Sequence, residues 1–232
     1  MIGTIINSAA ILLGTLCGVL AKRGIPERLR DAVMQGQGLC IVLIGLSGAL
    51  KTTSTLCMIL SIVLGSLLGA GLDIERRLNN LGERLEKRLL RGKTEENGGI
   101  ARGFVSGTLM YCVGAMAIVG AMNSGLHGDH STLIAKALLD GVISVFLASS
   151  LGIGVALSAV SVFLYQGLIT LLSGLLQSVL TDAVVTEMGA VGGLLVAGVG
   201  LNMIYDKHIS VGNMLPAMFL PIAILPLMQL FS

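Results

Sequence analysis

The chain has few charged and few aromatic residues: 12% of its 232 residues are charged, three are Tyr and none is Trp. A soluble domain carries roughly 25% charged residues, so this shortage of charge excludes an ordinary soluble globular protein. The formal net charge of +2 gives no reason to expect binding to nucleic acid. Most of the surface of this chain is therefore predicted to contact something other than water.

The apolar segments also lack motifs for catalysis and for metal binding. The four cysteines fall in apolar segments with no C-x-x-C spacing, so they are predicted to be small core residues. The apolar segments contain no H-E-x-x-H motif and no combination of Ser, His and Asp. No glycine run has the strand-to-helix context of a nucleotide fingerprint. We therefore expect neither an enzyme nor a protein that binds a metal or another cofactor.

Apolar residues and glycine are abundant instead, at 54% of the chain and 32 residues, with a mean hydropathy of +0.90. A membrane span needs about 20 mostly apolar residues to cross roughly 30 Å of hydrocarbon. Eight segments meet this requirement: 2–21, 32–50, 55–72, 103–122, 133–151, 155–176, 187–204 and 212–231. The predicted fold is all-α, a polytopic transmembrane helix bundle of about eight spans in a single integral membrane domain, 1–232.

The basic residues predict the orientation of this bundle. One threading of the eight segments places thirteen of the fifteen Lys and Arg residues on the same side, with Lys51 and Lys136 as the exceptions. Because basic loops stay in the cytoplasm, the long loop between the third and fourth segments is predicted to be cytoplasmic and both termini external. Residues 133–176 form either two full spans or a re-entrant hairpin, and the later segments keep their sides in both cases.

Residues 74–93 stand out within the long basic loop. Apolar side chains recur there at spacings of three and four, at Ile74, Leu78, Leu81, Leu85 and Leu89. This stripe predicts an amphipathic cytoplasmic helix, and a charged, Gly-rich linker extends the feature to 74–99. Three roles remain open: contact with the inner leaflet or extension of the third span, self-association in a homo-oligomer, and docking of a regulatory partner.

A short internal repeat relates the two ends of the chain. Residues 38–47, GLCIVLIGLS, align without gaps on residues 193–202, GLLVAGVGLN, and 11–16 resembles 171–176 at a slightly different offset. In the predicted topology the second and seventh segments run in opposite directions, so segments 1-3 and 6-8 are predicted to form an inverted repeat. Inverted repeats are the architecture of many secondary transporters. The alternative is a chance match, because such apolar patterns arise easily in membrane helices.

Polar side chains inside apolar segments mark a candidate solute or ion site. Asp140 lies within the fifth segment, with Lys136 one helical turn before it, and a carboxylate at depth costs about 2.5–3.5 kcal/mol on insertion scales. The pair is predicted either to bind a cation or proton, with Lys136 as the counter-charge of the empty site, or to be a structural ion pair. Four amides complete the candidate site: Asn7, Gln37, Gln166 and Asn202. Taken singly, such amides more often form interhelical hydrogen bonds.

Two other features carry weaker predictions. Glu187, at the start of the seventh segment, is predicted to lie at a solvated helix N-terminus, where a carboxylate complements the helix dipole. Pro216, Pro221 and Pro226 recur every five residues in the eighth segment and predict a kinked helix.

Several motifs along the chain resemble one known family. These are MIGTIINSAA at the N-terminus, IPERL at 25–29 with MQG at 34–36, CVGAMAIVG at 112–120, LDGVIS at 139–144 and AVGGLLVAGVGLN at 190–202. In combination they are similar to the YqgA/YdfK-like family of bacterial inner-membrane proteins (domain of unknown function 554), over nearly the whole chain. The resemblance implies a multi-pass protein of the bacterial inner membrane and supplies no substrate or site residues.

These observations favour one function and leave an alternative. The favoured function is a small secondary transporter or channel for a small polar or ionic solute, supported by the predicted repeat and by Asp140. The alternative is a non-transporting membrane sensor, scaffold or assembly factor that acts through the helix 74–93. The expected partners are the lipid bilayer and a small ion or polar solute, and a homo-oligomer remains open.

Overall fold

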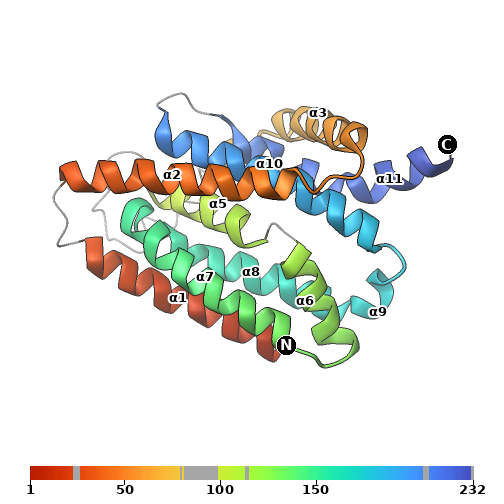
Figure 1. Ribbon diagram of the computed structural model, residues 1–232, viewed down its shortest axis with the longest axis horizontal. Coiled ribbons are helices and arrows are strands. Elements are labelled where there is room, and N and C mark those ends of the chain that lie inside the picture. Colours follow the sequence, from red (N-terminus) through yellow and green to blue (C-terminus); the bar gives the residue numbers. More distant parts are fainter. Residues whose placement is uncertain (23–26, 79, 81–98, 113–114, 206–208, 231–232) are drawn as a thin grey trace.

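The computed structural model describes the chain except for residues 23–26, 79, 81–98, 113–114, 206–208 and 231–232. The described residues form helices and no strand, which confirms the all-α prediction (Figure 1). The elements are α1 (Ile2–Lys22), α2 (Glu27–Ala49), α3 (Thr55–Gly71), α5 (Gly99–Cys112), α6 (Ala115–Leu126), α7 (Ser131–Leu151), α8 (Gly154–Leu171), α9 (Ser173–Leu176), α10 (Asp182–Ile204), the 3-10 helix η1 (Val211–Phe219) and α11 (Pro221–Leu230).

Several of these helices are long and apolar enough to cross a membrane. In the described part of the chain, four helices qualify alone, namely α1, α7, α8 and α10. The count rises to six if α5 with α6, which meet at 61°, and η1 with α11, which meet at 46°, each form one bent span. A helical membrane bundle is therefore confirmed, while the count of eight spans stays a prediction. Because α7 and α8 each qualify, the structure favours two full spans within 133–176.

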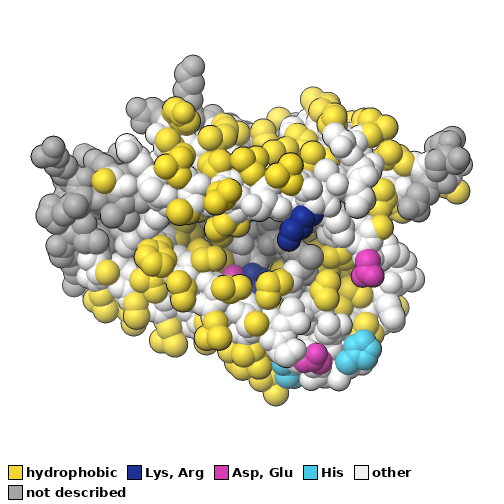
Figure 2. All heavy atoms as spheres, viewed as in Figure 1, with side chains coloured by type: hydrophobic (Ala, Val, Ile, Leu, Met, Phe, Trp, Pro, Cys, Tyr) yellow, Lys and Arg dark blue, Asp and Glu magenta, His cyan; other side chains and the backbone are white. Residues whose placement is uncertain are grey.

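The outer surface of the bundle is apolar. Leu13 on α1, Leu43 on α2 and Leu138 on α7 are 65%, 67% and 72% exposed. Figure 2 shows apolar side chains over much of the viewed face, with few charged side chains among them. Soluble monomers rarely expose large continuous apolar surfaces, whereas lipid tails solvate such a surface well.

The helices pack into two groups, visible as the lower and upper halves of Figure 1. In the first, called the α7 group, α1 packs along α7 and α5 packs along α8, with α6 and α9 at one end. In the second, called the α10 group, α2 packs along α10 and α3 packs along η1, with α11 beyond. Contacts within each group are far more extensive than contacts between the groups.

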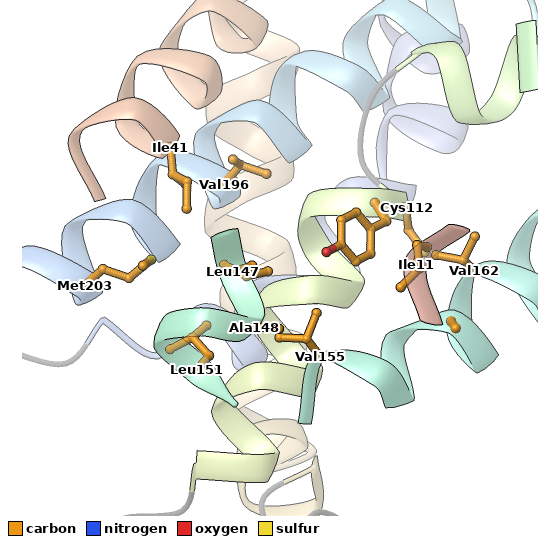
Figure 3. Close-up of a cluster of buried hydrophobic side chains, with 12 residues drawn as sticks. Ile11, Ile41, Cys112, Leu147, Ala148, Leu151, Val155, Val162, Val196 and Met203 are labelled. Carbon is orange, nitrogen blue, oxygen red and sulfur yellow. The ribbon is translucent and has the colours of Figure 1, made fainter. Parts of the chain in front are cut away.

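The interface between the two groups is mainly apolar. Ile41, Val196 and Met203 from the α10 group meet Leu147 and Leu151 from the α7 group in one buried cluster (Figure 3). Among the described residues, the side-chain hydrogen bonds that cross this interface all involve Gln37 on α2. Its Nε2 donates to the backbone oxygen of Phe146 at 2.9 Å, and its Oε1 accepts from the Ser150 hydroxyl at 2.7 Å. Directional bonds therefore join the groups at one place on α7.

Glycines set the closest approach of α2 and α10. A Cβ built on Gly45 would lie 2.6 Å from the backbone oxygen of Gly193, and one built on Gly193 would lie 2.7 Å from that of Gly45. Gly38 and Gly200 face each other in the same way, at 3.0 and 2.7 Å. Residue numbers rise on one helix as they fall on the other, so α2 and α10 are antiparallel. Small residues of this kind let membrane helices pack backbone to backbone.

Close contacts also fix the relative directions of the other pairs. Gly14 and Gly18 on α1 pack against Ser144 and Ala148 on α7, so α1 and α7 are parallel. The same reasoning makes α5 parallel to α8, because Gly103 packs against Gly154 and Gly107 against Ser158. It makes α3 antiparallel to η1, because Gly65 packs against Ala217 and Gly69 against Asn213. These are the relative directions that alternating crossings give to the same segments.

Two local predictions meet different outcomes. The kinked eighth segment is confirmed, because η1 contains Pro216, α11 begins at Pro221, and the two helices differ in direction by 46°. The amphipathic segment falls mostly outside the described residues. Residues 74–78 are helical and directly follow a turn after α3, and most of the rest of 74–99 is not described.

Candidate functional site

A salt bridge is buried within α7. Lys136 Nζ donates to both carboxylate oxygens of Asp140 at 2.8 Å, and the two residues are 6% and 3% exposed. Their spacing of four residues places both side chains on the same face of the helix. The pair predicted from the sequence is therefore present as an ion pair within a single helix.

Two amides from other helices lie beside this ion pair. Asn7 on α1 donates through Nδ2 to Oε1 of Gln166 on α8 over 3.4 Å, and both residues are fully buried. Gly3 packs against Leu133 and Ala10 packs against Gly141, so the register of α1 against α7 places Asn7 at the level of Lys136 and Asp140. Gly14 allows this arrangement, because it brings α1 into backbone contact with α7. Four of the six candidate residues thus meet where α1, α7 and α8 pack together, and we call these four the buried polar site.

The two amides leave hydrogen-bonding capacity unused. In the described residues, Asn7 Oδ1 and Gln166 Nε2 are buried and have no partner. Leaving a buried polar atom unpaired costs about 1–3 kcal/mol, so two such atoms side by side are unusual in a purely structural contact. Exchanging nitrogen and oxygen in both amides gives the same result, one free donor and one free acceptor. The site therefore offers one cation, one anion, one free donor and one free acceptor.

Residues that the sequence did not single out line the surroundings of this site. The Ser144 hydroxyl donates to the backbone oxygen of Asp140 at 2.6 Å, so the Tyr111 hydroxyl, 2.8 Å away, donates to Ser144. The Tyr165 hydroxyl on α8 is buried without a partner. Ile11 and Val162 belong to the apolar cluster on α1 and α8, as Figure 3 shows. Ser144 follows Asp140 by four residues, and that spacing is the one sequence signal that could have identified it.

The four residues of the buried polar site include one carboxylate and no His or Cys. Among the residues that the structure describes, no three His, Cys, Asp or Glu side chains gather into a group able to hold a metal ion. The chemistry of the buried polar site rests on one ion pair and two amides.

The other two candidate amides make structural contacts elsewhere. Gln37 joins the α7 and α10 groups through Phe146 and Ser150. Asn202 holds the segment after α10, because Nδ2 donates to the backbone oxygen of Ile209 at 2.7 Å and Oδ1 accepts from its backbone nitrogen at 2.8 Å. Neither belongs to the buried polar site.

Glu187 differs from the sequence-based expectation of a solvated carboxylate. It is fully buried, and its oxygens accept from the Thr52 hydroxyl at 2.6 Å and from the Thr53 backbone nitrogen and hydroxyl at 2.6 and 2.9 Å. The Ser54 backbone nitrogen donates to it at 3.0 Å. The expectation of a solvated group was wrong because donors of the connection between α2 and α3 replace water. The run Thr52-Thr53-Ser54 was the available signal.

Comparisons with known proteins agree with the membrane assignment. The family described as "Protein of unknown function (DUF554)" matches residues 2–226. The chain is 30% identical over 236 residues to the "Uncharacterized membrane protein YdfK" of Bacillus subtilis (strain 168), covering 100% of this chain and 99% of that protein. It is 32% identical over 221 residues to the "Uncharacterized protein YqgA" of Escherichia coli (strain K12), covering 95% and 94% respectively. No solved structure matches the chain.

Proposed function

This chain belongs to the DUF554 family, and from that premise we propose that it is a small secondary transporter for a small polar or ionic solute. The observation that carries the proposal is the buried polar site, where an ion pair and two amides with unused hydrogen-bonding atoms lie deep within apolar helices. Ionisable residues inside membrane helices are costly, and those that persist mark solute or ion pathways. A buried ion pair at this position is therefore a functional-site hypothesis by default.

The contacts between α2 and α10 support two related halves of opposite direction. In the predicted repeat Gly38 corresponds to Gly193 and Gly45 corresponds to Gly200. The contacts are exchanged, since Gly38 packs against Gly200 while Gly45 packs against Gly193. An approximate two-fold axis between two antiparallel copies produces this reciprocal pairing. Inverted copies can exchange conformations, and alternating access to a central site follows from that exchange.

The division into two groups supplies parts that move relative to each other. The α7 group carries the whole buried polar site, and the α10 group packs against the α7 group through a mainly apolar interface. Rearranging that interface breaks few directional bonds, because the crossing hydrogen bonds in the described chain involve Gln37 alone. Rocking of one group against the other opens the site to alternate sides of the membrane.

The distribution of basic residues supports the orientation of this transporter. The bacterial relatives favour the bacterial inner membrane, and eight crossings with the basic residues inside give a cytoplasmic long loop and external termini. The relative directions of the described helices agree with alternating crossings.

Reconstituted protein tests the proposal. Proteoliposomes containing the full chain are supplied with radiolabelled amino acids, small carboxylates and monovalent cations, with and without a pH gradient. We expect uptake of one class above that of empty liposomes, and loss of this uptake in Asp140→Asn. Asp182→Asn is the matched control, because Asp182 is exposed at the start of α10.

Absence of uptake by folded protein for every solute class would count against transport. Uptake that is unchanged in Asp140→Asn would count against the buried polar site as the solute pathway. A protein without flux that copurifies with a partner in a manner dependent on residues 74–93 fits the alternative of a sensor, scaffold or assembly factor.

A further inference from the structure

The two charges of the buried polar site cancel, and this limits what the site can bind. Lys136 and Asp140 supply each other's counter-charge in an environment that excludes water. A solute with a single charge would pair with one partner and leave the other uncompensated in a low dielectric. A solute that carries both charges avoids this cost, because each side chain exchanges one counter-charge for another.

The two amide atoms without partners also fit a solute that carries one positive and one negative group. Gln166 Nε2 is a free donor, so together with the Lys136 ammonium the site presents two donors. Asn7 Oδ1 is a free acceptor, so together with the Asp140 carboxylate the site presents two acceptors. Two donors suit a carboxylate and two acceptors suit an ammonium group, and hydrogen bonds that involve a charged partner are the stronger ones.

We propose that the buried polar site binds a small zwitterion, an amino-acid-like solute with one carboxylate and one ammonium group. The solute carboxylate accepts from Lys136 and Gln166. The solute ammonium donates to Asp140 and Asn7. Binding converts the salt bridge within α7 into two salt bridges with the solute, and the net charge of the interior does not change. The inference rests on the proposed function and names the substrate class of the same site.

A carboxylate that binds together with a proton on Asp140 is the competing neutral arrangement. Burial disfavours a charge on Asp140, whereas the two hydrogen bonds from Lys136 stabilise the ionised carboxylate. In the described part of the chain, Tyr111 and Cys112 on α5 are further titratable side chains near the pair, and the Tyr111 hydroxyl donates to Ser144. The ionised carboxylate needs a cationic partner, and a zwitterion brings one.

A thermal-stability assay on the purified full chain tests the substrate class, because a ligand that binds only the folded form raises its melting temperature. The zwitterionic probes are glycine, β-alanine and γ-aminobutyrate. The single-charge probes are propionate and ethylammonium, and propionamide is the neutral probe. We expect a saturable rise in melting temperature with at least one zwitterion and none with the other probes at equal ionic strength, at pH 6 and at pH 8.

Variants connect this response to the site. We expect Lys136→Gln and Asp140→Asn each to weaken the zwitterion response at least tenfold in half-saturating concentration. The double variant Lys136→Gln with Asp140→Asn removes both charges together, so it keeps the test open if a single variant does not fold, and it should lose the response. Gln37→Ala, which lies outside the site, should keep it.

The outcomes separate the inference from the proposed function. A response to propionate or ethylammonium that matches the zwitterion response and depends on Asp140 overturns the zwitterion and leaves transport standing. Failure of all three zwitterions to stabilise the protein also overturns the inference. Uptake of another solute class would in that case still support the proposal of transport. Zwitterion binding that depends on both charges, without uptake into proteoliposomes, upholds the inference and overturns transport.

Discussion

Thr53 donates both its backbone N–H and its hydroxyl to the same oxygen of the Glu187 carboxylate, at 2.6 and 2.9 Å. The two residues are 134 positions apart in the sequence, so this contact ties the connection between α2 and α3 to α10. Thr52 and Ser54 donate to the same carboxylate, and Ser54 is the N-cap residue of α3. One buried side chain therefore holds three helices of the α10 group together.

Replacing Glu187 by Gln should lower the stability of the protein. A glutamine side chain has the same size, but it carries no charge, and its N–H group would face the donors of Thr52, Thr53 and Ser54. We expect a loss of about 1–3 kcal/mol, the range for leaving a buried hydrogen-bonding group without its partner. Thermal unfolding in detergent, followed by circular dichroism, measures the change. Asp182→Asn is the matched control, and an equal effect in the two variants contradicts the role given to Glu187.

The ion pair on α7 should show strong non-additivity. Asp140→Asn or Lys136→Met alone leaves one charge buried without its partner, and we expect each to cost roughly 3–5 kcal/mol. The double variant leaves no charge, so most of the stability should return. Unfolding of the four proteins of the cycle in detergent gives the coupling energy. Additive losses in the double variant would show that the two side chains do not act as a pair.

The contact between α2 and α10 should tolerate no side chain at its centre. Gly45→Val places atoms where the backbone of Gly193 and Ala197 already lies, and overpacking of this kind costs about 1–3 kcal/mol. Gly36→Val is the matched control on the same helix, because no atom lies within 4 Å of a Cβ built there. Comparing their melting temperatures in detergent checks the prediction.

Because Gly45 and Gly193 share one contact, the effects of substituting both should not be additive. Once Gly45→Val has moved the helices apart, Gly193→Val should cost less than it does alone. Losses that simply add would mean that the two glycines do not share one contact.

Accessibility labelling should reveal the predicted topology. In a background without Cys17, Cys40, Cys57 and Cys112, we expect Lys51→Cys and His127→Cys to react from the external side. Arg88→Cys should react only from the cytoplasmic side. Lys51 is chosen in the connection between α2 and α3 because it is exposed, whereas Thr53 in the same connection donates to Glu187. Reaction of all three sites from one side is incompatible with the predicted crossings.

The amphipathic segment should act outside the bundle. Replacing Leu81 and Leu85 by Glu breaks the apolar stripe, and we expect weaker contact with the membrane surface or weaker self-association of a folded protein. Size-exclusion chromatography and crosslinking in membranes measure these effects, and Asn80→Glu is a control beside the stripe. Complete loss of the protein from the membrane fraction would instead make this segment part of the folded core.

Much of the fold could be predicted because insertion into a membrane depends on average hydropathy. The predicted segment 133–151 differs from α7 by two residues at its start. Hydropathy does not report bends, so the predicted segment 103–122 became α5 and α6, two helices that differ in direction by 61°. A bend leaves backbone N–H and C=O groups without their helical partners, so it depends on neighbouring groups that can form hydrogen bonds with them. A single sequence does not show which groups will be neighbours.

Part of the candidate site could be predicted, because a polar side chain within an apolar segment is costly to bury and therefore stands out in the sequence. Lys136, Asp140, Asn7 and Gln166 are polar groups deep in apolar segments, and the structure brings them together. Gln37 looked equivalent, yet its partners are the backbone oxygen of Phe146 and the Ser150 hydroxyl. Asn202 likewise bonds the backbone of Ile209. Backbone N–H and C=O groups occur along the whole chain. A sequence pattern therefore does not show which amide side chain will form hydrogen bonds to the backbone.

The pairing of early helices with late ones also has a consequence for how the protein is made. Gly14 contacts Ser144, and Gly45 contacts Gly193, so these partners leave the ribosome about 130 to 150 residues after the first member of each pair. At about 5–20 residues per second, α1 and α2 spend roughly 7–30 s in the bilayer before their partners are synthesised. During that time their glycine faces meet lipid or another chain. A nascent chain that stops before α7 leaves both faces without their native partners, which makes it a natural substrate for membrane quality control.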